Sequence, residues 1–90
     1  MRVRLSTQAT ADRQRLAAFL SEHDPRAALR AVDAITAGIG QLVDMPSIGK
    51  QVGGARELYI RFGDSGYVVQ YRMDTDAVIV ARIFHMREAR

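Results

Sequence analysis

The sequence predicts an α+β domain in which an N-terminal strand and an antiparallel helix hairpin precede a three-strand antiparallel meander. Both helices are expected to pack on one face of the sheet. In the first half of the chain, apolar residues recur at three- and four-residue steps behind helix-capping residues. In the second half, short strand-like runs are separated by turn residues. Because a chain of 90 residues can bury one core, residues 1–90 are expected to form a single domain.

The N-terminal segment predicts one strand and one amphipathic helix. Polar and apolar residues alternate in "RVRL" (residues 2–5), as in a short strand. Ser6 is a suitable N-cap for a helix over about 7–22, in which Leu16 and Leu20 lie on one apolar face.

The second helix has a sharper start. Asp24 is a good N-cap, and Pro25 suits the first turn, where its missing N–H leaves no hydrogen bond unmade. Apolar residues at helical spacing continue to about Val43. Gly38 and Gly40 each weaken this helix by about 1 kcal/mol relative to alanine, so packing must hold its last turns. A short joint between the helices predicts an antiparallel hairpin.

A Pro- and Gly-rich segment, "DMPSIGKQVGGA", then predicts a connecting loop. Three strand-like runs follow at 56–62, 66–72 and 77–85. Their joints, "GDSG" and "MDTD", are short and rich in turn residues, so consecutive strands are expected to pair as antiparallel hairpins.

Alternation along the strands assigns side chains to the two faces of the sheet. Leu58 and Ile60 are expected to face the helices, as are Ile79, Ala81 and Ile83 in the last strand. His85 shares the parity of these last three, at the point where the strand ends. Val78 and Val80 are then expected on the uncovered face, which also collects Tyr59, Arg61, Gln70, Arg72, Arg82 and Phe84. This arginine-rich face suits a phosphate or an acidic protein, although any one-sided sheet also needs a polar outer surface.

The composition restricts the function. Twelve arginines and one lysine give a net charge of +3 and a pI of about 10.0, which suits an anionic partner, although a genomic bias toward arginine would also produce it. No cysteine is present, and two isolated histidines do not predict a metal site or a cofactor. The chain shows no signal peptide and no membrane-spanning run, so a cytoplasmic protein is expected.

Three stretches resemble one family, the RelE/ParE toxins of bacterial type II toxin-antitoxin modules. They are "PSIGKQVGGARELYI" (46–60), "YVVQYR" (67–72) and "VIVARIFHMRE" (78–88). The resemblance implies a growth-inhibiting toxin, of the kind associated with plasmid stabilization, that a small cognate antitoxin neutralises. In the family, a disordered antitoxin tail folds onto the helices. Here the resemblance implies an antitoxin contact through Arg13, Leu16, Leu20 and Arg30.

Two activities occur on this fold. RelE-like toxins cleave mRNA on the ribosome, and ParE-like toxins bind DNA gyrase without being enzymes. A nuclease here would use Glu57, Arg61, Arg72 and His85, with Tyr59 and Arg82 as further candidates. The family's nucleases carry an arginine where this chain has Val68, and valine cannot stabilise charge on a phosphate. The resemblance therefore favours a gyrase inhibitor with no catalytic residue and no cofactor.

In that interpretation, the target-binding residues are expected to be Tyr59, Arg61, Arg72, Arg82, His85 and Arg87. ParE-like chains often continue beyond this arginine, whereas the present sequence stops at Arg90. Two expectations stay open: the target contact lies earlier in the chain, on the sheet and the Tyr59 and Arg61 surface, or the potency of the toxin is reduced.

Overall fold

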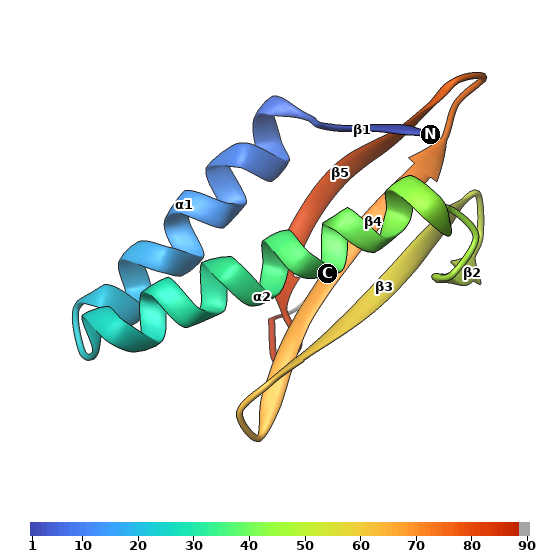
Figure 1. The fold of residues 1–90 in the computed structure, drawn as a ribbon. Helices are drawn as coiled ribbons and strands as arrows, with labels where there is room; N and C mark the ends of the chain where they lie inside the picture. The colour runs from blue at the N-terminus through green and yellow to red at the C-terminus, as the bar shows by residue number, and fades with distance from the viewer. Residues whose placement is uncertain (89–90) are drawn as a thin grey trace.

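The computed structural model describes residues 1–88 as two helices packed on one face of a five-stranded sheet (Figure 1). The elements are β1 (Arg2–Leu5), α1 (Thr7–Ser21), α2 (Pro25–Asp44), β2 (Lys50–Val52), β3 (Ala55–Phe62), β4 (Ser65–Met73) and β5 (Ala77–His85). The strand order is β1-β5-β4-β3-β2, in which β1 runs parallel to β5 and all other neighbours are antiparallel. The predicted fold class and element order are confirmed.

Both predicted helix caps are present. The Ser6 hydroxyl accepts a hydrogen bond from the Ala9 N–H at 3.0 Å, and the Asp24 carboxylate accepts from the N–H groups of Arg26 and Ala27. Pro25 occupies the first position of α2, as predicted. These caps satisfy backbone donors that the first turn leaves without a partner. Within residues 1–88, neither helix combines the length and the apolar character needed to cross a bilayer.

Gly38 weakens α2 by propensity but is required by packing. It is buried, and a Cβ at this position would overlap the side chain of Ile60 on β3. The glycine therefore allows α2 to lie directly against the sheet, where Ile35 and Leu42 complete the contact with the core. Gly40 lies on the other side of the helix, where a Cβ would meet nothing within 4 Å.

The segment predicted as a loop contains a short strand, so that prediction is wrong in part. Lys50–Val52 pairs with β3 as an antiparallel hairpin, with Gly53 at φ 60° in the turn. All three residues of this strand are exposed, so they lack the apolar alternation that marks a half-buried strand. The preceding residues are anchored by Tyr71, whose hydroxyl donates to the Pro46 carbonyl and accepts from the Gly49 N–H, both at 2.8 Å.

The predicted parity of β5 is also wrong over its first half. An irregularity in the β4–β5 register places Gln70 opposite Arg82 but Tyr71 opposite Val80, leaving Ala81 as the extra residue. Val78 and Val80 therefore face the core, where both are fully buried, and Ile79 and Ala81 do not join the core cluster. Beyond the bulge the prediction is correct, since Ile83 belongs to the core and Arg82 lies opposite Gln70.

Candidate functional site

The uncovered face of the sheet has an apolar row at its centre. Cross-strand neighbours place Val68 on β4 between Tyr59 on β3 and Phe84 on β5. Val68 is fully buried and Phe84 is 9% exposed, whereas Tyr59 is 45% exposed. None of the three residues of this row is charged, and Tyr59 offers an accessible aromatic side chain at one end of it.

A fixed carboxylate lies next to this row. Glu57 is buried, its Oε1 accepts a hydrogen bond from the Tyr59 hydroxyl at 2.8 Å, and its Oε2 accepts from Gln70 Nε2 at 2.9 Å. Both carboxylate oxygens are therefore engaged with neighbouring side chains. The network holds the Tyr59 ring in one orientation on the face.

The predicted cations on this face are spread over its length. Arg61 lies opposite Gly66 near one end of β4, and Arg72 lies near the other. The distance between these positions along the strand is about 20 Å. Arg61 and Arg72 are both exposed and belong to two separate regions of the face.

Two arginines that sequence reasoning did not assign to the site join Arg72. Because β1 pairs parallel with β5, Arg4 lies opposite Ile79, and Ile79 lies opposite Arg72 on its other side. Arg2 lies one pleat further along β1, opposite Ala77. The alternation in "RVRL" already places both arginines on one side of their strand. The sequence did not indicate that β1 would pair with β5, which is what brings Arg2 and Arg4 near Arg72.

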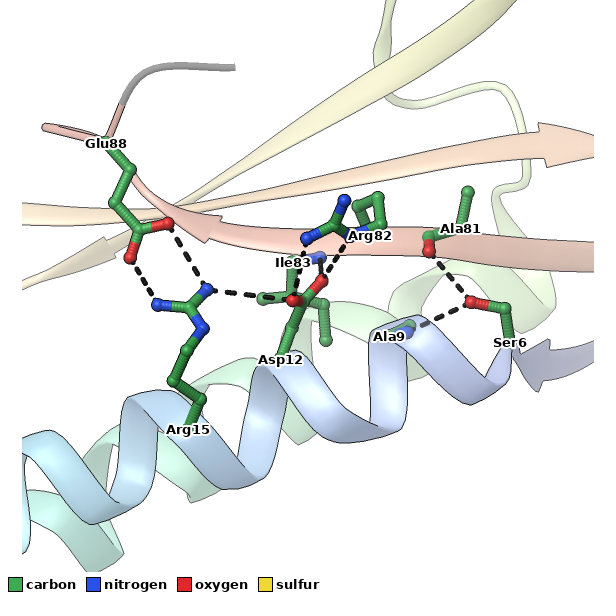
Figure 2. A network of polar contacts seen from close by, with 8 residues as sticks. All are labelled: Ser6, Ala9, Asp12, Arg15, Ala81, Arg82, Ile83 and Glu88. Atoms are coloured by element: carbon green, nitrogen blue, oxygen red, sulfur yellow. Dashed lines mark hydrogen bonds and ion pairs between the residues drawn. The ribbon is translucent and has the colours of Figure 1, made fainter.

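Where α1 passes β5, a buried carboxylate organises the contact. Asp12 is 5% exposed and accepts hydrogen bonds from Arg82 Nε at 2.8 Å, Arg82 Nη2 at 3.0 Å and the Ile83 N–H at 2.9 Å (Figure 2). Burial alone would raise the pKa of the Asp12 carboxyl. The hydrogen bonds from Arg82 and Ile83, together with the charges of Arg82 and Arg15, outweigh burial and hold that pKa below its ordinary value.

The same region attaches the last described residues to α1. Arg15 donates to both carboxylate oxygens of Glu88, at 2.7 and 3.2 Å, and the Ser6 hydroxyl donates to the Ala81 carbonyl at 2.8 Å (Figure 2). We call this set of contacts the α1–β5 seam: Ser6, Asp12 and Arg15 on one side, and Ala81, Arg82, Ile83 and Glu88 on the other. Arg82, a predicted target-binding residue, is therefore paired within the chain, and its guanidinium also lies 4.7 Å from the centre of the Phe84 ring.

A groove opens on the helix side of the sheet, between α1 and the β3–β4 turn. Its volume is about 810 Å³. Leu16 and Leu20 line it from α1, and Phe62 and Tyr67 line it from the sheet. Phe19 also lines it and is 65% exposed. The groove is therefore mainly apolar, and its charged lining residues are Arg15, Asp64, Arg87 and Glu88.

His85 belongs to this groove. Its ring contacts Tyr67 edge-on, with centroids 5.5 Å apart, and its Nδ1 accepts a hydrogen bond from the Arg87 N–H at 3.2 Å. A nitrogen that accepts carries no proton, so this geometry places the proton of the neutral ring on Nε2. Glu57 lies on the uncovered face and His85 on the helix side. The structure therefore does not bring the four candidate nuclease residues together.

The residues predicted to contact an antitoxin divide in two. Leu16 and Leu20 line the groove, whereas Arg13 and Arg30 do not. Arg87 is exposed and lines the groove, and Arg15, which also lines it, is paired with Glu88. Among residues 1–88, no group of three or more histidines or carboxylates is placed to hold a metal ion.

This fold is that of the small toxins of the RelE/ParE superfamily. A chain described as "Chromosomal ParDE TA system from P. aeruginosa" has the same fold, with a TM-score of 0.81 and 21% sequence identity, over 94% of this chain and 95% of that chain. A family model described as "ParE toxin of type II toxin-antitoxin system, parDE" matches residues 3–90. The chain belongs to this family of toxins, and its family implies a cognate antitoxin as partner.

Two relatives from Caulobacter vibrioides extend the likeness over nearly the full length. Toxin RelE1 is 43% identical over 89 residues, which is 98% of this chain and 96% of that protein. Toxin RelE3 is 42% identical over 89 residues, covering 98% and 97% respectively.

Proposed function

We propose that this toxin arrests growth by binding DNA gyrase and blocking it, without cleaving RNA. The observation that carries the proposal is the separation of the candidate nuclease groups. Glu57 is engaged on one face, His85 lines the groove on the other, and the sheet positions of Arg61 and Arg72 are about 20 Å apart. Cleavage through a 2′-hydroxyl requires a base, an acid and a cation around one phosphate.

The target contact that we propose is centred on Tyr59 and Arg61. Both are exposed, and both lie on the uncovered face of β3. Hydrogen bonding to Glu57 orients the Tyr59 ring before binding, which lowers the entropy that binding would cost. Tyrosine and arginine are the residue types most often found at the energetic centre of protein interfaces.

The groove is the site that we propose for the antitoxin. Its apolar walls, formed by Leu16 and Leu20 on one side and Phe62 on the other, suit the apolar face of an amphipathic helix. Arg87 lines the groove and forms no ion pair within residues 1–88, so it provides positive charge that suits an acidic segment. Leu16 and Leu20 keep the role that was predicted for them, and Arg13 and Arg30 are not part of this proposal.

A supercoiling assay with purified gyrase tests the proposed activity. The toxin should inhibit supercoiling at near-stoichiometric concentrations, and Tyr59→Ala combined with Arg61→Gln should weaken inhibition at least tenfold. Arg30→Gln is the matched control, because Arg30 is exposed on α2 and its loss changes the net charge equally. Full supercoiling at a large excess of folded toxin would exclude gyrase as the target.

A second candidate is supported by the names of the two Caulobacter relatives, both of which are called RelE toxins. On that reading the chain would cleave mRNA in a ribosome-dependent reaction. A translating extract supplied with a defined message separates the two activities. New message ends that appear with the wild-type toxin and disappear with Glu57→Gln would favour the nuclease, and an intact message would favour gyrase binding.

A further inference from the structure

We infer that the uncovered face carries a binding surface for the phosphate backbone of duplex DNA, centred on Arg4 and Arg72. The inference rests on the proposed function for its biological setting, since gyrase acts while it holds DNA. The surface lies apart from the Tyr59 and Arg61 contact, near the opposite end of β4.

The strand register brings the two arginines together. Arg4 on β1 and Arg72 on β4 flank Ile79 of the intervening strand β5, so their backbones are two strand spacings apart, about 10 Å. Val3 and Leu5 pack against the core, so Arg2 and Arg4 point to the uncovered side. Ile79 is only 9% exposed although it lies on the uncovered face. The side chains beside it are those of Arg4 and Arg72, whose long apolar stems can cover it.

The charges of these arginines are available to a ligand. Among residues 1–88, neither Arg4 nor Arg72 forms an ion pair, in contrast to Arg82, which is bound to Asp12. Glu57, the carboxylate in the adjoining part of the face, already accepts hydrogen bonds from two side chains. Within residues 1–88, Arg4 and Arg72 therefore have no carboxylate partner in an ion pair.

The neighbouring acids define the limits of the surface. Asp74 and Asp76 lie in the exposed turn between β4 and β5, and Asp76 directly precedes Ala77, the cross-strand neighbour of Arg2. Arg2 is therefore at the acidic edge of the surface, and Arg4 and Arg72 form its centre.

The arrangement favours a nucleic acid backbone over a protein partner. Arg4 and Arg72 are exposed, and Ile79 between them is nearly buried, so the surface offers charge and little apolar area. Protein interfaces usually need an apolar or aromatic centre. B-DNA carries one negative charge about every 1.7 Å along its axis. Because this spacing is much shorter than the separation of Arg4 and Arg72, each of the two arginines can meet a phosphate on the same duplex.

Fluorescence anisotropy of a short labelled DNA duplex, with toxin alone and without gyrase, tests the inference. Wild-type toxin should bind with an affinity that falls as salt rises. Arg4→Gln combined with Arg72→Gln should weaken binding at low salt by about tenfold. It should also reduce the magnitude of the slope of log K against log salt by about 1.8, or about 0.9 for each lost phosphate contact. Circular dichroism and a thermal melt establish that the variant is folded.

Arg26→Gln combined with Arg30→Gln is the matched control. It removes the same charge from exposed positions on α2, in the helix layer on the other side of the sheet. If the control weakens binding as much as the double variant, net charge and not this surface explains the affinity, and the inference fails. It also fails if the wild-type toxin shows no salt-dependent binding to the duplex.

Two competitors test the identity of the ligand. Single-stranded RNA that displaces the duplex at lower concentration would overturn the assignment to DNA. If polyglutamate displaces the duplex as well as unlabelled DNA does at equal charge concentration, the surface recognises carboxylates, and the assignment to DNA is overturned too. Wild-type toxin that inhibits gyrase but does not bind the duplex would remove this inference alone, whereas wild-type toxin that binds the duplex but does not inhibit gyrase would remove only the proposed function.

Discussion

At the α1–β5 seam the arginines are bound by carboxylates, whereas on the uncovered face the exposed arginines are not. Arg15 and Arg82 each donate to an acid from a distant part of the sequence. Arg4, Arg61 and Arg72 form no ion pair among residues 1–88. The same residue type thus stabilises the fold in one region and remains available for recognition in the other. The seam is expected to govern stability, and the face is expected to govern binding.

The largest effect is expected from Asp12→Ala. The substitution leaves the buried Ile83 N–H without its acceptor and removes the partner of Arg82. Unfolding in urea should show a loss of about 2–3 kcal/mol. Asp33→Ala, an exposed position on α2, should change stability by less than about 0.5 kcal/mol. Equal losses in the two variants would mean that the seam has no special role.

Acid should weaken the seam through the same carboxyl. Because the pKa of Asp12 is lower in the folded protein than in the unfolded chain, its stabilising contribution is complete above the unfolded pKa of about 3.9. That contribution is lost as pH falls through the folded pKa. The urea midpoint of wild-type toxin should therefore decline more steeply below about pH 4 than that of Asp12→Asn. Parallel declines would contradict an ionised Asp12 in the native state.

Two glycines of α2 separate the effect of packing from the effect of helix propensity. Gly38→Ala should destabilise the toxin by about 1–3 kcal/mol, because the added methyl overlaps Ile60. Gly40→Ala should stabilise it by up to about 1 kcal/mol, because the site is open and alanine favours the helix. Thermal melts of both variants should move in opposite directions. A rise in both would show that α2 can shift away from β3 at little cost.

A smaller effect is expected at the outer end of the seam. Arg15 and Glu88 form a bidentate pair, but the Arg15 side chain is about half exposed. Glu88→Gln should therefore lower stability by about 0.2–1 kcal/mol, and less at high salt. Denaturant titrations at two salt concentrations measure this difference. A salt-independent loss would point to packing of the last described residues instead of charge.

The smallest effect on stability is expected on the uncovered face. Arg61→Gln and Arg72→Gln should each change the free energy of unfolding by less than about 0.5 kcal/mol, because both side chains are exposed and neither forms an ion pair within residues 1–88. Their effects should appear in gyrase and DNA binding. A destabilisation as large as that of Asp12→Ala would remove the distinction between the two regions.

The sequence was sufficient for most of the fold because its strongest signals are local. Ser6, Asp24 and Pro25 mark the helix starts directly, and alternation marks the three long strands. The bulge at Ala81 could not be predicted in the same way. Val78, Ile79 and Val80 are all apolar, so the local sequence fits either choice of which of them face the core. Only the pairing with β4 decides which side each residue faces.

The candidate site was less predictable because it depends on contacts distant in sequence. Alternation correctly placed Tyr59 and Arg61 on one face. It did not reveal that Arg82 would reach Asp12, 70 residues away along the chain, or that Arg4 would lie in line with Arg72. Both facts follow from β1 and α1 lying beside β5, which a single sequence does not encode in any short pattern.

The side chains of Ser6 and of α1 also determine where another chain can add to the sheet. Beyond Leu5, β1 no longer covers β5, and an exposed strand edge would normally accept an incoming strand. Here the Ala81 carbonyl is occupied by Ser6 and the Ile83 N–H by Asp12. This part of β5 is therefore protected from edge-to-edge aggregation. An extended partner segment would have to pair at the outer edge of β1 or β2 instead.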